Sequence, residues 1–326
     1  MKKESTQTKN GKAFEYAILK EFKEKLERAT VVQVVENNGL LTAQKHFNSF
    51  EELEQGEFLL YASFAVNFLI DIEPRLSNSF DESDILQLEI LTDDKGQDGD
   101  VRDVVAIRLL QKWEIGISAK NNHKAVKHSR LSNKIDFGEK WLGIKSSKQY
   151  FNEIKPIFDS LEKMRKESNK TKTWKSLGDY HSTIYTPILE AFKRELLRIY
   201  NTNPSKVSST LVEYLIGNKD FYKVIKGKKD IEIQAYNLHG TLNLPFKEIN
   251  PKFNTPKINL PTEIKNISYK KDTLTTLIVE LNNDWTLSFR IHNASSRIES
   301  SLKFDINLLK APNSLFTNKL SIEVNK

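Results

Sequence analysis

The chain has 326 residues, enough for one large domain or two ordinary ones with a substantial hydrophobic core. It contains no cysteine, which excludes disulfide bonds, cysteine-ligated zinc and thiol nucleophiles. The formal net charge is +7 at pH 7, with 38% hydrophobic and 29% charged residues, a composition typical of a globular protein that dissolves in water.

The first part of the chain predicts a polar tail followed by helices and a strand. Residues 1–10 are polar, and we expect them to be disordered. Apolar residues recur at helical spacing over residues 14–26 and 51–72, and residues 86–91 are typical of a strand. No segment has the apolar character of a signal peptide or a membrane span, so we expect a cytoplasmic protein with no membrane partner.

A β-hairpin is predicted next. Residues 104–107 and 113–119 form its two strands, with residues 111–112 at the spacing of a two-residue turn. Counting outward from that turn places Asp103 opposite Lys120. A carboxylate and an ammonium group would then lie side by side at the open end of an apolar hairpin.

An aspartate beside a lysine at a strand end can carry out phosphodiester hydrolysis. The carboxylate can hold Mg²⁺, which takes oxygen ligands and keeps several waters. The lysine can orient or deprotonate the attacking water and stabilise the developing negative charge. A surface ion pair is the commoner explanation for any single pair of this kind. The polar, basic and histidine-containing segment after Lys120 favours the catalytic interpretation.

Asp103, the apolar hairpin and the sequence Ile117-Ser118-Ala119-Lys120 resemble the PD-(D/E)xK nuclease core. Two features depart from that pattern, because no proline precedes Asp103 and Ser118 stands at the usual second acidic position. Longer strings resemble the HaeIII-type family of Type II restriction endonucleases, namely SAKNNHKAVKHSRLS, IDFGEKWLG and SFRIHNASS. The family resemblance extends over most of the chain.

The resemblance implies which carboxylates complete the site. Asp103 would bind the metal ion, and Asp100 is the alternative for that role. Some restriction enzymes with a serine at the second acidic position take the missing carboxylate from the following helix. Glu139, with Asp136 as its rival, lies at a suitable distance downstream. Glu15, in the first predicted helix, would complete the metal shell.

Basic residues are concentrated after the hairpin. Such a cluster beside a metal site suits a polyanion, although a solvated helical face is the commoner reason for a charge run. A nuclease site built on a histidine base needs a ββα arrangement with a second metal ligand, which the sequence does not show. We therefore predict contacts to phosphates or bases by His123, Lys124, Lys127, His128 and Arg130.

The rest of the chain predicts two helices and then a β-rich region. The helices cover residues 149–166 and 184–200, and short alternating runs separated by prolines begin near residue 221. Asn282–Asp284 is typical of a hairpin turn. The strand after it ends in polar residues that are suited to base edges, although an ordinary polar strand exit is the alternative. The candidate base-reading residues are Arg290, His292, Asn293 and Arg297.

These features together predict an α/β fold: a PD-(D/E)xK-like mixed sheet flanked by helices, with a β-rich C-terminal region. We expect a disordered tail at residues 1–10, a nuclease core at 11–204 and a β-rich DNA-recognition region at 205–326, which is either a separate domain or a continuation of the nuclease core. The predicted function is Mg²⁺-dependent, site-specific cleavage of double-stranded DNA. The resemblance implies the target GGCC, blunt ends and a cognate DNA methyltransferase encoded nearby. A non-catalytic DNA-binding protein is the main alternative, and a scaffold that does not bind DNA is a third.

Overall fold

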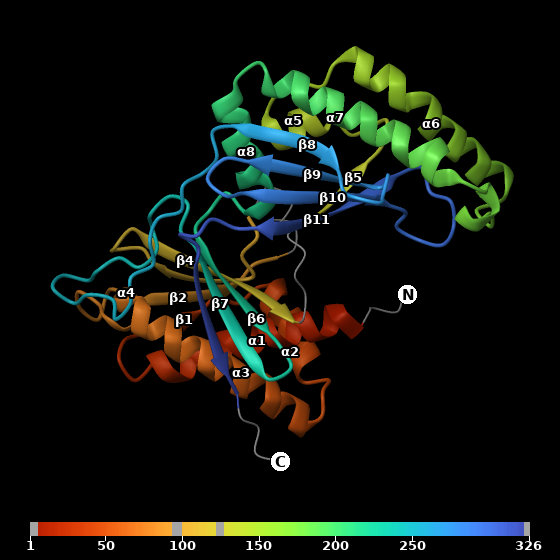
Figure 1. Cartoon of the computed structure of the whole chain (residues 1–326). Helices are drawn as coiled ribbons and strands as arrows, with labels where there is room; N and C mark the ends of the chain where they lie inside the picture. Colours follow the sequence, from red (N-terminus) through yellow and green to blue (C-terminus); the bar gives the residue numbers. More distant parts are fainter. Residues whose placement is uncertain (1–5, 93–99, 122–126, 323–326) are drawn as a thin grey trace. The chain divides into compact units, whose positions relative to one another are not determined.

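A computed structural model of the chain describes residues 6–92, 100–121 and 127–322, and it divides into two compact units. The first unit comprises the described residues of 1–124, 217–259 and 313–326, and the second comprises those of 125–216 and 260–312. Each unit is therefore assembled from segments that are far apart in sequence (Figure 1). This division differs from the expected boundary at residue 204, because strands that follow that residue pair into both sheets.

The first unit is built on a mixed sheet. In the described residues this sheet has seven strands in the order β1-β2-β3-β4-β6-β7-β12. Pairs β1/β2 and β4/β6 are parallel, and the other neighbouring pairs are antiparallel. The strands are β1 (Val32–Val34), β2 (Leu86–Ile90), β3 (Val104–Arg108), β4 (Trp113–Asn121), β6 (Phe221–Lys226), β7 (Asp230–Tyr236) and β12 (Phe316–Ser321).

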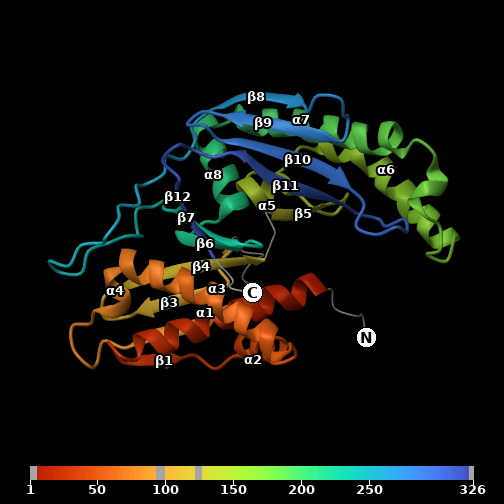
Figure 2. The same cartoon turned by 60° about the horizontal axis from the view of Figure 1, so that its bottom comes forward.

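Helices of the first unit supply the apolar core of that sheet. Helices α1 (Thr6–Leu26) and α3 (Glu52–Ile72) pack together and against the sheet, with α2 (Asn38–Phe47) beside α1 and the short α4 (Pro74–Ser77) after α3 (Figure 2). Alternate residues of β4, including Ile115 and Ile117, are buried in this core. Helix α1 begins at Thr6, so residues 6–10 are helical and not part of a disordered tail. The buried stripe that starts at Ala13 anchors the helix, and each added residue gains one backbone hydrogen bond.

The predicted hairpin is present, but its register differs from the expected one by two residues. Val104 pairs with Ile117, and continuing this register places Asp103 opposite Ser118 instead of Lys120. The connection between the strands has four residues, 109–112, and Lys112 in it has a φ of 48°. Because side chains alternate between sheet faces with a period of two, a shift of two residues keeps Asp103 and Lys120 on the same face.

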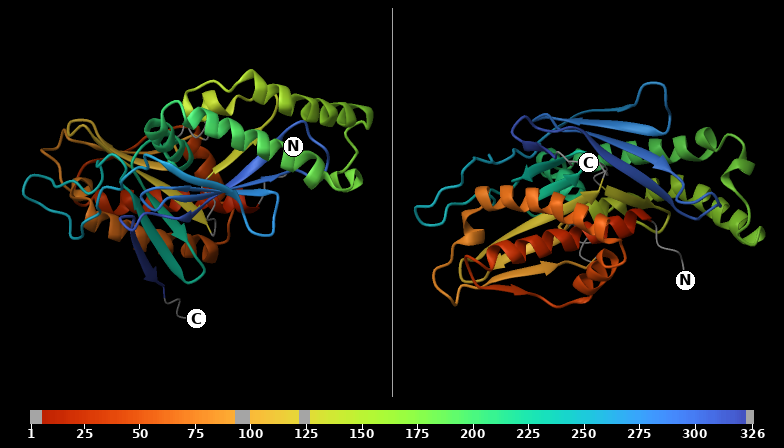
Figure 3. Two further views of the ribbon diagram at one scale, coloured as in Figure 1. Left: turned by 45° about the horizontal axis from the view of Figure 1, so that its top comes forward. Right: turned by 90° about the horizontal axis from the view of Figure 1, so that it is seen from below.

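The second unit is built on an antiparallel sheet, which in the described residues has five strands in the order β5-β11-β10-β9-β8. Its strands are β5 (Lys127–Leu131), β8 (Ile264–Tyr269), β9 (Thr276–Leu281), β10 (Thr286–His292) and β11 (Leu302–Lys310). Its α-helices are α5 (Phe137–Leu142), α6 (Lys148–Glu167), α7 (Thr186–Tyr200) and α8 (Pro204–Ile216) (Figure 3). Aromatic side chains of α5, α7, β10 and β11 form its core, including Phe137, Trp141, Phe192, Phe289 and Phe304.

The predicted α/β class, a mixed sheet flanked by helices, is confirmed. The hairpin turn predicted at Asn282–Asp284 is also present, since it joins β9 to β10 with Thr286 opposite Glu280. The β-rich C-terminal residues do not form one region, because β6, β7 and β12 extend the first sheet whereas β8 to β11 form the second. None of the helices in the described part of the chain has the length and apolar character needed to cross a membrane.

Candidate active site

The carboxylate of Asp103 is held at the end of the hairpin formed by β3 and β4. We call β3 and β4 the catalytic hairpin, after the role that the sequence predicts for it. Its Oδ2 accepts hydrogen bonds from the backbone N–H of Ala119 at 2.7 Å and from Lys120 Nζ at 3.0 Å. The hydroxyl of Ser118 lies 3.4 Å from the same oxygen. All three donors come from consecutive residues of β4, so the hairpin register alone fixes the position of this carboxylate. The predicted pairing of Asp103 with Lys120 is therefore present in the structure.

The ion pair between Asp103 and Lys120 remains accessible to a substrate. The two side chains are 20% and 30% exposed, so solvent reaches both. A partly exposed ion pair of this kind contributes little to the stability of a fold. Its position at a strand end is instead suited to contacts with a bound anion.

Helix α1 adds a second carboxylate to this group. Glu15 lies on the buried face of α1, is only 5% exposed, and accepts a hydrogen bond from Lys12 Nζ at 3.0 Å. Burial raises the pKa of Glu15 to about 8, and the negative charge of Asp103 adds to this effect, while Lys12 and Lys120 oppose it. Glu15, Asp103 and Lys120 are therefore close enough to interact electrostatically.

These groups fit a divalent metal ion with oxygen ligands. Burial and the charge of Asp103 disfavour the ionised form of Glu15, and a divalent cation beside the two carboxylates would favour it. Among the described residues no cluster of three or more His, Cys, Asp and Glu side chains is arranged to hold a metal. Glu15 and Asp103 would thus provide the protein carboxylates, and waters would fill other positions, as is usual for Mg²⁺.

Asp100 is engaged with an arginine. Arg102 donates to both carboxylate oxygens of Asp100 at 2.8 Å and approaches Glu114 at 3.2 Å. Burial alone would raise the pKa of Asp100, but the hydrogen bonds and charge of Arg102 hold it below its usual value. The side chain of Arg102 lies over Gly116, where a Cβ atom would fall 1.9 Å from Arg102 Cδ. Asp100 thus has a structural partner in Arg102, whereas the partners of Asp103 are the Ala119 N–H and Lys120.

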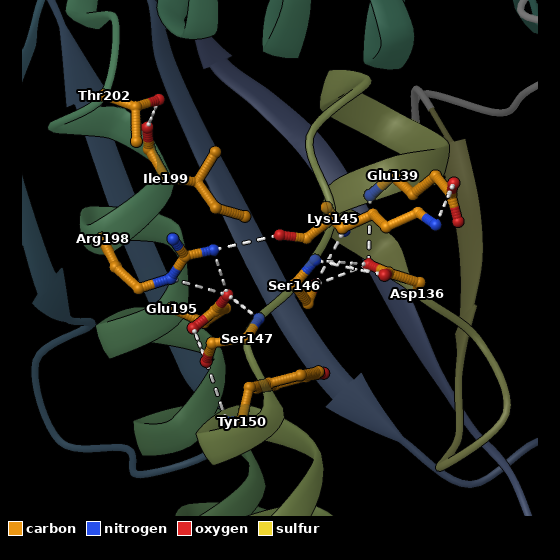
Figure 4. Close-up of polar contacts among 11 residues, drawn as sticks. Asp136, Glu139, Lys145, Ser146, Ser147, Tyr150, Glu195, Arg198, Ile199 and Thr202 are labelled. Atoms are coloured by element: carbon orange, nitrogen blue, oxygen red, sulfur yellow. Dashed lines mark hydrogen bonds and ion pairs between the residues drawn. The ribbon is translucent and has the colours of Figure 1, made fainter.

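Asp136 and Glu139 belong to the second unit. Asp136 is the N-cap of α5, where its Oδ1 accepts from the Glu139 N–H at 3.0 Å and from the Ser146 hydroxyl at 2.6 Å (Figure 4). Burial would raise the pKa of Asp136, but these hydrogen bonds keep it lowered. The side chain of Glu139 is 57% exposed and lies 3.8 Å from Lys145 Nζ. Aspartate is one of the residues preferred at a helix N-cap, so Asp136 has a sufficient structural role.

A second network lies beside this cap. Glu195 of α7 accepts from the Ser147 N–H at 2.6 Å and from the Ser147 hydroxyl at 2.8 Å. Arg198 donates to the same carboxylate at 2.7 Å (Figure 4). Burial would raise the pKa of Glu195, but Arg198 and Ser147 keep it below its usual value.

The structure describes only part of the predicted DNA-binding set. His123 and Lys124 lie outside the described residues, and for Lys127 and His128 only the backbone within β5 is described. Arg130 of β5 is exposed, and its Nη1 donates to Ser301 Oγ at 3.1 Å.

Polar residues at the end of β10 interact with one another and with the core of the second unit. Arg290 and His292 both pair with Asp305 of the neighbouring strand β11, the histidine at 3.1 Å. Asn293 accepts a hydrogen bond from the Tyr185 hydroxyl at 3.0 Å. Arg297 has an exposed side chain, and its backbone carbonyl accepts from Trp174 Nε1 at 2.9 Å. The catalytic hairpin belongs to the first unit, and the second unit contains Arg130, Arg290, His292, Asn293 and Arg297.

The sequence analysis missed one charged residue near the hairpin. Lys223 lies in β6, pairs in register with Ser118 of β4, and is only 8% exposed. Its signal in the sequence was the run FYKVIK, in which Lys223 and Lys226 interrupt an otherwise apolar strand.

Comparison with known proteins shows the family. The profile of the HaeIII restriction endonuclease family matches residues 11–312. The chain is also 40% identical over 305 residues to the Type II restriction enzyme HaeIII of Haemophilus aegyptius, covering 93% of this chain and 94% of that protein. No solved structure matches the chain. The chain therefore belongs to the HaeIII restriction endonuclease family, whose members are site-specific deoxyribonucleases.

Proposed function

We propose that this restriction endonuclease hydrolyses DNA at the end of the catalytic hairpin, with Mg²⁺ as its metal ion, in a site of the PD-(D/E)xK type. The observation that carries the proposal is the convergence of Ala119, Lys120 and Ser118 on one oxygen of Asp103, with Glu15 beside it. Type II restriction enzymes typically require a divalent ion, and the oxygen donors here suit Mg²⁺.

The residues have distinct roles in this proposal. Asp103 and Glu15 hold the metal ion, which when bound polarises the phosphate and favours ionisation of water. Lys120 orients the attacking water, accepts its proton or stabilises the negative charge that develops on the phosphate. The N–H of Ala119 fixes Asp103, so that Asp103 in turn fixes the amine of Lys120. Ser118 occupies the position of the second acid and contributes a hydroxyl near the site.

The structure gives weaker support to two other predictions from the sequence, which concern the second carboxylate and the alternative to Asp103. Glu139 remains an alternative source of the second carboxylate, and Asp136 and Asp100 remain candidates as well. Asp136 and Asp100 already accept several hydrogen bonds that hold their charged forms. Glu15 has the opposite character, because burial and the charge of Asp103 raise its pKa in spite of its ion pair with Lys12. Glu15 is therefore the second ligand that the geometry supports best.

The similarity to the HaeIII enzyme extends the proposal to sequence specificity. We assign this chain the target GGCC, cleavage that leaves blunt ends, a cytoplasmic location and a cognate methyltransferase encoded nearby. Its support is the 40% identity to the HaeIII enzyme over nearly the whole chain. Arg290, His292, Asn293 and Arg297 are the proposed base-reading residues, and arginine is suited to the guanine edges in such a target.

The experiment that tests this function is digestion of phage DNA by the purified full-length protein. With Mg²⁺ we expect discrete fragments whose sequenced ends are blunt and derive from GGCC. With EDTA we expect no cleavage. A smear of fragments would contradict site specificity, and DNA binding without cleavage in Mg²⁺ would favour a non-catalytic DNA-binding protein.

A further inference from the structure

Lys223 is placed beside the catalytic hairpin by a parallel strand pair. Strand β6 runs next to β4, with Ser118 opposite Lys223 and Lys120 opposite Ile225. Because directly paired residues of neighbouring strands point to the same sheet face, Lys223 shares a face with Ser118 and Lys120. The opposite face carries Tyr222 and Val224, which are buried in the apolar core.

Among the described residues, Lys223 has no carboxylate within ion-pair distance, and Glu232 acts on its charge only from farther away. The side chain is 8% exposed, and in the described part of the chain it makes no hydrogen bond or ion pair. The pKa of Lys223 is lowered to about 8, chiefly by burial and also by the charge of Lys120, while Glu232 opposes both effects. Gln234, which pairs with Lys223 on β7, donates its amide nitrogen to Glu232 and accepts at its amide oxygen from Tyr236.

A second buried lysine of the same strand shows what a structural lysine looks like in this fold. Lys226 is 7% exposed, yet its Nζ lies 2.7 Å from Glu57 Oε1 and 4.3 Å from the centre of the Tyr61 ring. An ammonium group is seldom buried without such partners, since removal from water disfavours its charge. Lys223 is as buried as Lys226 but has no such partner among the described residues, which leaves its ammonium group available to an anion from outside the protein.

We propose that Lys223 is a further substrate-binding residue of this endonuclease and contacts a backbone phosphate of the DNA at the cleavage site. The inference rests on the proposed function and adds to it, because it assigns the phosphate a second cationic contact beside Lys120. A phosphate oxygen bound between the two lysines would give Lys223 an anionic partner and Lys120 a second one beside Asp103. In the absence of DNA the two lysines repel each other.

The test compares Lys223→Met with Lys226→Met, which are two neutral substitutions of similar size on one strand. Single-turnover cleavage of a GGCC duplex is measured with Mg²⁺, and binding of that duplex is measured over a salt titration with Ca²⁺ in place of Mg²⁺. We expect Lys223→Met to slow cleavage by about 100-fold or more without lowering the unfolding temperature. It should also reduce the slope of log affinity against log salt by about one unit.

Lys226→Met should lower the unfolding temperature and leave the cleavage rate constant of the folded enzyme unchanged. Lys223→Arg keeps the charge and should restore part of the rate and the salt slope. Loss of folding in Lys223→Met with full activity in Lys223→Gln would assign the lysine a structural role and overturn the proposal.

Neutral phosphate analogues identify the contact directly. A methylphosphonate is placed at one backbone position of the duplex at a time, and each duplex is cleaved by both enzymes. At one backbone position the methylphosphonate should slow cleavage by the wild type but should not slow cleavage by Lys223→Met any further. If the effects of the methylphosphonate and of Lys223→Met on the cleavage rate were additive at every position, a phosphate contact by Lys223 would be contradicted. Absence of wild-type cleavage of phage DNA would instead refute the proposed function, whereas equal rates for wild type and Lys223→Met would refute only this inference.

Discussion

Two groups of charged side chains in this molecule differ in how well their charges are compensated. We call Glu15, Asp103, Lys120 and Lys223 the hairpin cluster, and Asp136, Glu195 and Arg198 the cap cluster. In the cap cluster, hydrogen bonds and Arg198 lower the pKa values of both carboxyl groups, which favours their charged forms. In the hairpin cluster, burial raises the pKa of Glu15 to about 8 and lowers that of Lys223 to about 8, which favours their neutral forms.

The difference indicates which cluster serves the fold and which serves a ligand. A polar group that is fully paired within the protein stabilises the structure and gains little from an outside partner. Buried ionisable groups whose pKa values are shifted toward the neutral form, next to a partly exposed ion pair, are typical of functional sites. A metal ion and a phosphate would compensate the charges of the hairpin cluster, which supports our proposal that DNA is cleaved there.

The largest expected effect concerns Lys120. Lys120→Ala should slow DNA cleavage by on the order of 10³-fold, because it removes the group that orients or deprotonates the water. Folding and specific DNA binding should stay nearly unchanged, since the lysine is 30% exposed and forms only a partly exposed ion pair. The measurement is a single-turnover cleavage rate with a parallel unfolding curve. Lys145→Ala, on an exposed lysine near the cap cluster, is the control, and a Lys120→Ala enzyme as fast as that control would remove Lys120 from the mechanism.

The buried carboxyl group of Glu73 sharpens the comparison, because it is poorly compensated yet lies in the core. It is fully buried and accepts from the Tyr222 hydroxyl and the Asn243 N–H, each at 2.6 Å, while its Oε2 has no partner among the described residues. Burial raises the pKa of Glu73 to about 7. The stability that it contributes is therefore fully present below about pH 4.5 and is lost as the pH rises through about 7.

Glu73→Gln should remove this part of the pH dependence. The difference between the wild type and the variant should change by about 3 kcal/mol at most between pH 4 and pH 8, as measured by denaturant unfolding. Cleavage should be unaffected, because poor compensation marks a functional site only where a ligand can reach it. If the folded Glu73→Gln enzyme failed to cleave DNA, a poorly compensated group that no ligand reaches would also matter for function, and our criterion for a functional site would be wrong.

Charges outside both clusters separate specificity from affinity. Arg290→Ala should cost roughly 1–3 kcal/mol of binding on GGCC and much less on a scrambled duplex, if the arginine reads a base edge. Arg130→Ala should weaken both duplexes in parallel and lower the salt slope by about one unit, as expected for a phosphate contact. Salt titrations on both duplexes measure this. Equal losses on both duplexes for Arg290→Ala would show that its pairing with Asp305 is its main role.

The smallest expected effect concerns the cap cluster itself. Asp136→Ala removes the N-cap of α5 and should lower the free energy of unfolding by about 1 kcal/mol. Its cleavage rate should match the wild type at temperatures where it is folded. Glu139→Ala should change neither property much. The sequence interpretation predicts otherwise, with Glu139→Ala far more damaging to cleavage than Ser118→Ala, so the same cleavage assay on these variants decides whether Glu139 or Glu15 is the second metal ligand.

Local sequence patterns were sufficient to predict which side chains lie close together on the two strands of a hairpin. Asp103 and Lys120 were paired from the spacing of two neighbouring strands, and the error of two residues in register did no harm because it kept the sheet face. The predicted helices and the turn at Asn282–Asp284 were likewise local features. Glu15 entered only through the family resemblance, since a lone glutamate on a helix is usually solvated.

Contacts between distant segments could not be predicted in this way. Lys223 comes beside Ser118 through a parallel pairing of β4 with β6, strands separated by about a hundred residues that include most of the second unit. Parallel pairing requires a long crossover, and no turn residue marks its register. The return of β12 to the first sheet also removed the expected boundary at residue 204. The charge of Lys223 was visible in the sequence, but its neighbours were not.

The most direct test of the account exchanges one carboxylate for its amide in each cluster. Cleavage rate and unfolding temperature are measured for Glu15→Gln and Glu195→Gln under the same conditions. We expect Glu15→Gln to lose cleavage and keep or raise its unfolding temperature, because a buried carboxyl group with a raised pKa is replaced by a neutral one. Glu195→Gln should unfold at a lower temperature and cleave DNA normally while folded. The reverse pattern, with cleavage lost in Glu195→Gln and retained in Glu15→Gln, would contradict the assignment of the two clusters.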